Sequence, residues 1–206
     1  QYFLSAASIG DIVQNHLSSY ATLENLPDKV AIQLNDTHPT LAIPEMMRIL
    51  LDECGFGWDK AFDICQKVFS YTNHTVMAEA LEKWNVDIFK MTLPRIYQIV
   101  VEMNRRAREE LEKAFPGDEG KINYMALIGD NQVRMANICA YTANSINGVS
   151  KLHSEIIKDS VFHDYYLFKP NAFKNVTNGI AYRRWLLCSN PGLTHLLEET
   201  IGDGFK

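Results

Sequence analysis

Apolar residues recur every three or four positions over much of the chain, a pattern typical of helices that bury one face. The pattern predicts helices at residues 2–17, 41–53, 58–67, near 78–84, 93–115, 131–141, 151–158, from 184 and at 193–201. The stretch 93–115 is the longest, and Pro116-Gly117-Asp118 ends it. Helices are therefore expected to make up most of the fold.

Short apolar runs rich in β-branched and aromatic residues lie between the predicted helices. Strands are predicted at residues 30–34, 68–72 and 143–149, and a short strand or extended segment at 123–128. Residues 161–168 are rich in aromatic side chains and fit either a helix or a strand. Strands that alternate with helices predict an α/β fold with a parallel sheet.

Two polar clusters directly follow the first two predicted strands. The first is Asn35-Asp36-Thr37-His38, and the second is Asn73-His74. Ligands of parallel α/β sheets bind in the crevice at the carboxyl ends of the strands, so both clusters are expected to face one cleft. Asn, Asp and His side chains supply the directional donors and acceptors that sugar hydroxyls need.

These residues also have other interpretations. Asp36, followed by Thr37 and Pro39, could simply cap the helix that comes next. Asp36, His38 and His74 could instead serve a metal-dependent hydrolase, although neither histidine lies in a ligand spacing such as HExxH. The sequence holds no GxSxG turn, P-loop or GxGxxG motif. The residues alone therefore predict an α/β segment with a polar, sugar-compatible cleft.

Composition and charge exclude several classes of protein. The formal net charge is −5, and the basic pairs Arg105-Arg106 and Arg183-Arg184 are isolated, so no nucleic-acid footprint is expected. No apolar run reaches the roughly 18 residues that span a membrane. No cysteine belongs to a CxxC pair, which makes a zinc knuckle unexpected and favours reduced cytosolic thiols. The cysteines are Cys54, Cys65, Cys139 and Cys188.

Several segments resemble the α-glucan phosphorylase family, which acts on glycogen, starch or maltodextrin. They occur in the family's order and at about its spacing, and the resemblance covers nearly the whole chain. Together they are far more specific than any one of them. The segments are residues 29–45, residues 71–76 with Glu79-Ala80-Leu81-Glu82, Asn147-Gly148-Val149, Leu152-His153-Ser154-Glu155, and Thr177-Asn178-Gly179-Ile180 with Arg183-Arg184-Trp185.

The resemblance implies the helix-rich part of a two-lobed, GT-B type glycosyltransferase with Rossmann-like lobes and a catalytic cleft between them. Residues 1–176 correspond to the later part of the N-terminal lobe. Residues 177–206 correspond to the crossover and the truncated start of the C-terminal lobe. An internal fragment of a longer polypeptide is therefore expected, in keeping with a start at Gln1-Tyr2-Phe3.

The resemblance also implies a reaction for the parent enzyme. Inorganic phosphate would cleave the terminal α-1,4-linked glucose of a glucan and release glucose 1-phosphate with retained configuration. The family's cofactor is pyridoxal phosphate, bound by a lysine in a segment that this chain lacks, so the chain alone is expected to be inactive. The parent is expected to be a cytoplasmic homodimer.

Matching positions in the family's motifs gives the expected substrate contacts. His74 is expected to contact the 6-hydroxyl of the bound glucose, and Asn178 to share that contact from the other lobe. Asp36 and His38 are expected to line the cleft near the sugar, and Glu82 to lie at its edge. Each would act by orientation and hydrogen bonding rather than as a nucleophile, and no complete catalytic set is expected in this chain.

Two departures from the family pattern matter. Gln14-Asn15 stands where AMP-regulated animal members carry an Arg-Arg pair that binds nucleotide phosphate, so no animal-type AMP activation is expected here. Ala181-Tyr182 stands where many members have Thr-Pro, close to Asn178. The alternative function is a non-catalytic carbohydrate-binding or assembly module, which would keep the cleft residues without needing the lysine.

Overall fold

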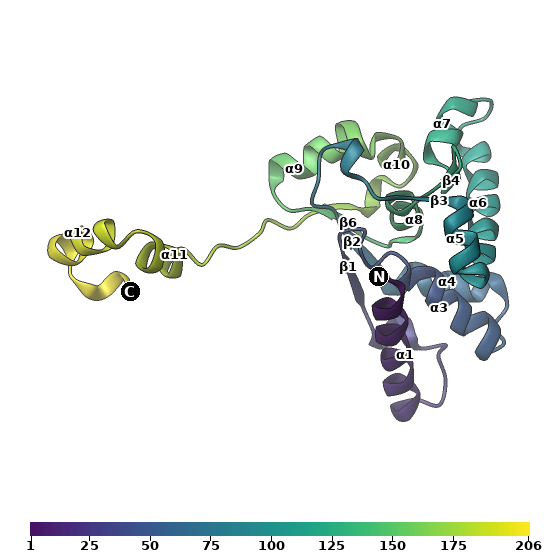
Figure 1. Ribbon diagram of the computed structural model, residues 1–206, viewed down its shortest axis with the longest axis horizontal. Coiled ribbons are helices and arrows are strands. Elements are labelled where there is room, and N and C mark those ends of the chain that lie inside the picture. Colours follow the sequence, from purple (N-terminus) through teal and green to yellow (C-terminus); the bar gives the residue numbers. More distant parts are fainter. The chain divides into compact units, whose positions relative to one another are not determined.

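The computed structural model describes residues 1–206 except for the side chain of Ala78. The chain forms two compact units, Gln1–Val176 and Thr177–Lys206 (Figure 1). The second unit consists of two helices and a final 3-10 turn: α11 (Tyr182–Ser189), α12 (Pro191–Ile201) and η5 (Asp203–Phe205). The Asn190 side chain caps α12 by accepting from the Leu193 N–H at 3.2 Å. No helix in the described residues is long and apolar enough to cross a membrane.

A four-stranded parallel sheet organises the first unit. Leu34 pairs with Tyr71, and Tyr71 pairs with Ile146, so these buried side chains line one face of the sheet. The predicted α/β class and the three predicted strands of this sheet are confirmed. In spatial order the strands are β1 (Ile32–Asn35), β2 (Phe69–Thr72), β6 (Ile146–Gly148) and β7 (Phe173–Asn175).

The helices of the first unit cover the apolar face of the sheet. The order β1-β2-β6-β7 means that each connection advances in the same direction, and right-handed crossovers of this kind put their helices on one face. The other face carries the exposed residues Gln33, Asn35 and Lys174. The main helices are α1 (Tyr2–Ser19), α2 (Leu26–Lys29), α3 (Ala42–Arg48), α4 (Trp58–Val68), α5 (Val86–Thr92), α6 (Pro94–Ala114), α7 (Glu119–Met125), α8 (Met135–Thr142), α9 (Lys151–Ile156) and α10 (His163–Phe168).

Most of the predicted helices are confirmed. Residues 2–17, 58–67 and 93–115 correspond to α1, α4 and α6, and residues 161–168 end in the helix α10. The helix expected at 41–53 is α3 continued by a π-helical stretch, η1 (Ile49–Glu53), and that at 151–158 is α9 continued by η3 (Ile157–Val161). A short 3-10 turn, η4 (Pro170–Ala172), leads into β7.

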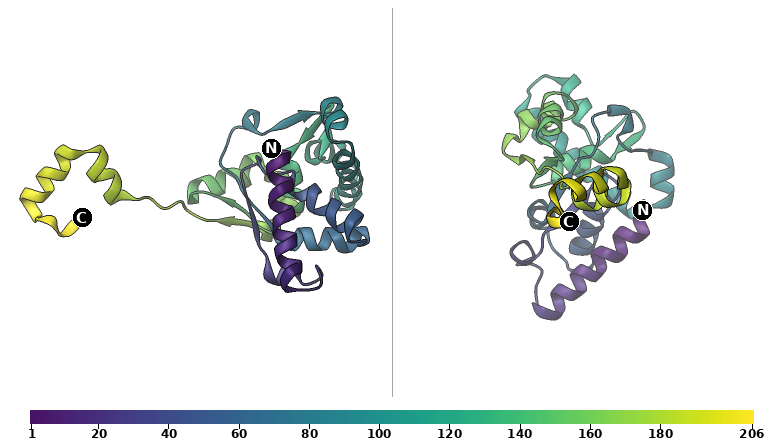
Figure 2. Two further views of the ribbon diagram at one scale, coloured as in Figure 1. Left: turned by 60° about the horizontal axis from the view of Figure 1, so that its bottom comes forward. Right: turned by 90° about the vertical axis from the view of Figure 1, so that its left-hand side faces the viewer.

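Helix α1 packs beside α3 and strand β1 (Figure 2). The Tyr2 hydroxyl donates to the carboxylate of Glu45 on α3 at 2.7 Å. Arg48 donates to both oxygens of the same carboxylate, at 2.8 and 3.0 Å. Glu45 is buried, and a buried carboxylate needs such partners, so this cluster holds Tyr2 of α1 against α3.

The prediction of a helix near residues 78–84 is wrong for the second half of that segment. Only a short 3-10 turn, η2, forms there, and the chain then enters a strand of a small antiparallel sheet. Trp84 lies opposite the fully buried Val133, so a distant partner rather than local periodicity decides the structure. The same pairing makes residues 132–134 a strand, and the helix predicted at 131–141 begins only at Met135. The elements are η2 (Ala78–Ala80), β3 (Lys83–Asn85), β4 (Ile128–Gly129) and β5 (Gln132–Arg134), in the order β3-β5-β4.

The prediction of an extended segment at residues 123–128 is also wrong for the first half of that segment, because α7 continues to Met125. Asp118 accepts a hydrogen bond from the Lys121 N–H at 3.0 Å and so caps α7. The turn Pro116-Gly117-Asp118 therefore ends one helix and starts the next.

Cys139 on α8 is fully buried beneath the segment that joins β1 to α3. Its sulfur lies 3.1 Å from the hydroxyl of Thr40. Burial raises the pKa of this thiol to about 12, the bond with Thr40 opposes the rise, and the carboxylates of Asp36 and Glu82 add to it. The folded chain therefore keeps this proton over a range in which an exposed thiol would lose it.

Replacing Cys139 is predicted to reduce the loss of stability at alkaline pH. From pH 9.0 to about 12 the unfolded chain releases the thiol proton while the folded chain retains it. The free energy of unfolding therefore falls by about 1.4 kcal/mol per pH unit for this group, and is unaffected by it below that window. Urea unfolding at several pH values should show a shallower decline for Cys139→Ala than for the natural chain. Cys188→Ala, at an exposed thiol, is the control that should leave the decline unchanged.

Gly148 is predicted to tolerate no side chain. A Cβ atom there would lie 2.8 Å from the backbone nitrogen of Ser154 and 2.9 Å from its Cα. Gly148→Ala should lower the free energy of unfolding by about 1–3 kcal/mol, because the turn into α9 would have to open. Gly10→Ala, in α1 with nothing within 4 Å, should instead raise it by about 0.5–1 kcal/mol. Equal effects of the two variants in denaturant titrations would contradict this account.

Candidate functional site

The polar clusters after β1 and β2 lie side by side at the carboxyl edge of the parallel sheet. Asn35 pairs with Thr72 in register, and the Asp36 N–H donates to the carbonyl of Thr72 at 2.9 Å. The Asn73 N–H in turn donates to the carbonyl of Asn147 on β6 at 3.0 Å. The structure thus brings Asp36 and the loop of His74 to one edge, beside the end of β6.

His74 is exposed, and its ring is oriented by Asn35. The ring Nε2 lies 2.5 Å from the Asn35 Oδ1. A carbonyl oxygen only accepts, so Nε2 carries the proton in this pair. Nδ1 has no hydrogen-bond partner among the described residues, which leaves it available to a hydroxyl group.

The backbone on either side of His74 is fixed. The Asn73 side chain is fully buried, donates to the Tyr71 hydroxyl at 3.1 Å and accepts from the Thr75 N–H at 3.1 Å. Burial raises the pKa of the Tyr71 hydroxyl far above its usual range, so it stays protonated. An exposed histidine therefore stands on a loop whose preceding residue belongs to the core.

Asp36 has a left-handed backbone conformation, with φ of 63°. Asp is one of the few residues that adopt this region readily. Its Oδ1 accepts from the N–H of Thr37 at 2.7 Å. The capping interpretation of Asp36 is wrong, because α3 begins after Leu41 without a side-chain cap. The second carboxylate oxygen has no hydrogen-bond partner among the described residues.

Glu82 joins this cluster from the segment before β3. It accepts from the Thr37 hydroxyl at 3.3 Å, the Gln1 amide at 2.7 Å and the Trp84 indole at 3.1 Å. Its backbone carbonyl accepts from the Met135 N–H at 3.1 Å, at the start of α8. Asp36 and Glu82 therefore both contact Thr37. This position of Glu82 is compatible with its expected place at the edge of the sugar cleft.

His38 and Asn178 are not brought into this cluster by the described contacts. His38 is exposed and lines a separate hollow of about 350 Å³ between α1 and β1. Asn178 is exposed and belongs to the second unit. Their roles as substrate contacts stay predictions, as do those of His74, Asp36 and Glu82.

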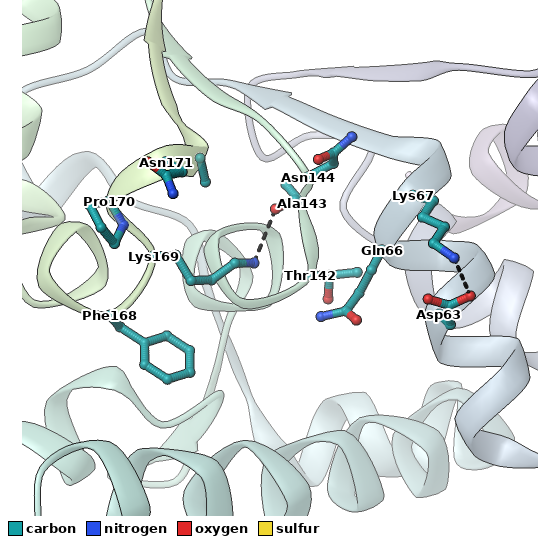
Figure 3. Close-up of a pocket in the computed structure, with 11 residues that line it drawn as sticks. Asp63, Gln66, Lys67, Thr142, Ala143, Asn144, Phe168, Lys169, Pro170 and Asn171 are labelled. Atoms are coloured by element: carbon teal, nitrogen blue, oxygen red, sulfur yellow. Dashed lines mark hydrogen bonds and ion pairs between the residues drawn. The ribbon is translucent and has the colours of Figure 1, made fainter.

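A cavity of about 510 Å³ lies at the opposite, amino edge of the sheet (Figure 3). Lys169 extends into it and donates to the carbonyls of Tyr141 and Ala143 at 2.8 and 3.1 Å. Burial lowers the pKa of this amine to about 8. Lys67 on the far side pairs with Asp63 at 2.7 Å. The buried amine thus serves the C-terminal end of α8, where a cation is favourable.

No group of three or more His, Cys, Asp or Glu side chains in the described part of the chain is arranged to hold a metal ion. The proposed metal set of Asp36, His38 and His74 is therefore not assembled here. The Nε2 of His74 that such a site could use is instead bonded to Asn35.

The sequence analysis did not identify one residue that contacts the loops at the carboxyl edge of the sheet. His153, on α9, bonds the loop that carries His74 through the carbonyl of Thr75. It stands within a segment that resembles the family, yet neither its spacing nor its neighbours mark it as a partner of a loop 78 positions away.

Comparison with known proteins bears on this geometry. The family model described as carbohydrate phosphorylase matches residues 1–206. Glycogen phosphorylase of Bacillus subtilis is 48% identical over 203 residues, which are 98% of this chain and 25% of that protein. The brain form of glycogen phosphorylase from Rattus norvegicus is 47% identical and the human muscle form 45% identical, each covering 100% of this chain and 26% of the relative.

The chain thus spans about a quarter of the length of these relatives. The match runs from the first residue to the last and includes both polar clusters. The chain belongs to the carbohydrate phosphorylase family.

Proposed function

We propose that this chain is part of an α-1,4-glucan phosphorylase that releases glucose 1-phosphate from glycogen or maltodextrin with inorganic phosphate. The observation that carries the proposal is identity of 45–48% to glycogen phosphorylases over essentially the whole chain. The cluster of donors and acceptors at the carboxyl edge of the sheet supports it, since sugar sites need such groups.

The proposed architecture is the two-lobed GT-B type. Gln1–Val176 would form the later part of the N-terminal lobe, and Thr177–Lys206 the crossover and the start of the C-terminal lobe. In this arrangement His74 and Asn178 would each offer a polar side chain to the same sugar hydroxyl. The parent would be a cytoplasmic homodimer.

The residues at the sheet edge would hold the sugar rather than react with it. The free Nδ1 of His74 can accept a hydrogen bond from a glucose hydroxyl, because Asn35 keeps the ring proton on Nε2. The unpartnered carboxylate oxygen of Asp36 can accept a hydrogen bond from a second hydroxyl. Holding one glucose ring in a single orientation favours attack at its anomeric carbon, since productive geometry is set before the reaction begins.

We propose that the lysine that binds pyridoxal phosphate, the family's cofactor, lies outside this chain. Among the described lysines, Lys169 has a strongly buried amine. This amine donates to two backbone carbonyls at the amino edge of the sheet. The candidate sugar contacts lie at the carboxyl edge. The chain alone is therefore proposed to be inactive.

The parent enzyme is proposed to lack activation by AMP of the animal type. Gln14 and Asn15 are exposed on α1, and the Asn15 amide donates to Asp11 at 3.1 Å. Two neutral amides cannot replace the bidentate contacts that an Arg-Arg pair makes with a phosphate.

Replacing His74 in the full-length polypeptide should lower kcat/KM for maltodextrin. Loss of one oriented hydrogen bond at the reacting sugar is expected to reduce it by about 10-fold or more for His74→Ala. Glucose 1-phosphate release in the presence of phosphate and pyridoxal phosphate is the measurement. His163→Ala is the matched control, because His163 is exposed on α10 and bonds only the nearby Lys158 carbonyl.

The same assay separates the alternatives. Activity in this 206-residue chain by itself would refute the claim that it lacks essential parts. Absence of glucose 1-phosphate from the full-length polypeptide would reject the phosphorylase proposal. Retained glucan binding in that case would favour a carbohydrate-binding module.

A further inference from the structure

His153 is a buried histidine that connects two segments at the carboxyl edge of the sheet. Its Nδ1 accepts from the backbone N–H of Val149 at 3.1 Å, in the turn between β6 and α9. Its Nε2 lies 3.2 Å from the carbonyl of Thr75, in the loop after β2. Its side chain thus spans the ends of two neighbouring strands.

These partners determine the protonation of the ring. The Val149 N–H can only donate, so Nδ1 must be unprotonated, and the Thr75 carbonyl can only accept, so Nε2 must carry the proton. The neutral Nε2–H tautomer satisfies both bonds.

The bond to Thr75 acts on the residue next to His74. Asn73 holds one side of His74 through its buried side chain, and His153 holds the other side through the Thr75 carbonyl. Asn35 then orients the ring itself. Without His153, Thr75 would keep its N–H bond to the Asn73 side chain but lose its bond to α9, and the position of the His74 ring would be less restricted.

The support beneath His153 is rigid. Its own N–H donates to the Ser150 hydroxyl, the N-cap of α9, at 3.1 Å. The adjoining Ser154 hydroxyl donates to the Ser150 carbonyl at 2.8 Å, and Ser154 packs so closely on Gly148 that no Cβ would fit. The histidine is thus fixed to the sheet while it contacts the loop.

We propose that His153 is a positioning residue that holds the His74 loop in the geometry needed to bind the sugar. This inference rests on the proposed function for its catalytic consequence, but the loop contact itself can be tested without activity. His153 would not touch substrate. It would act through Thr75 and His74.

The first test is amide hydrogen exchange on this chain. His153→Phe keeps a planar ring and removes both hydrogen bonds. Two sets of peptides are followed, those that cover residues 73–77 and those that cover Val149. Their backbone amides should exchange about 10-fold faster than in the natural chain, because one lost hydrogen bond weakens local protection by about that factor. His163→Phe is the control and should leave these peptides unchanged. Unchanged exchange in His153→Phe would overturn the inference.

The second test is a double-mutant cycle in the full-length enzyme. His153→Phe should lower kcat/KM for maltodextrin by up to the loss that His74→Ala causes, about 10-fold, through misplacement of His74. If His153 acts through His74, the double variant His74→Ala/His153→Phe should lie within about 2-fold of His74→Ala. Losses that multiply would show that His153 has a separate, general structural role and would overturn the inference.

His153→Gln guards against a variant that fails to fold. The glutamine amide offers one acceptor and one donor, so it should restore much of the protection and the activity. A folded His153→Gln chain whose 73–77 peptides exchange as fast as in an unfolded segment would contradict the proposal. An inactive natural enzyme would refute the proposed function alone, because the exchange experiment would still decide whether His153 holds the loop.

Discussion

The direction of the sheet connections is the constraint on which the first unit depends. Three crossovers advance from β1 to β2, β6 and β7 without reversing, so right-handed connections leave every covering helix on the same face. That face carries the apolar side chains, including Leu34, Tyr71 and Ile146. All four strands also end at one edge, which gathers the loops after β1, β2 and β6. A single topological choice thus produces both the core and the polar edge.

The uncovered face of the sheet is held by polar side chains instead of a helix layer. The Gln33 amide donates to the Thr72 hydroxyl at 2.8 Å, and that hydroxyl donates to the Asn147 Oδ1 at 2.8 Å. These bonds run across three strands near the loops that carry Asp36 and His74. A one-residue slip of any strand would break them and turn polar groups into the core, so they help to define the register on which the site relies.

Sequence patterns predicted the elements whose structure is decided locally. Three of the four strands of the parallel sheet were predicted, and the clusters at Asn35 and Asn73 followed from short apolar runs that end in polar residues. The fourth strand, β7, was not predicted. The strand at Lys83–Asn85 could not be predicted, because it forms only against Gln132–Arg134. This distant pairing also sets the position of Glu82. The role of His153 was hidden for the same reason, since its partner Thr75 is remote in sequence.

The candidate site is largely organised before any ligand arrives. His74 is bonded to Asn35, Thr37 to Glu82, and Asp36 to the backbone of Thr37. Two groups stay unpartnered among the described residues, Nδ1 of His74 and the second oxygen of Asp36. A sugar hydroxyl bound to these groups, as proposed, would displace no protein hydrogen bond, so little of its binding energy would be lost to reorganisation. The supporting bonds lie in the sheet and in α9, so under the proposed function residues that do not touch the sugar would still decide how well it is held.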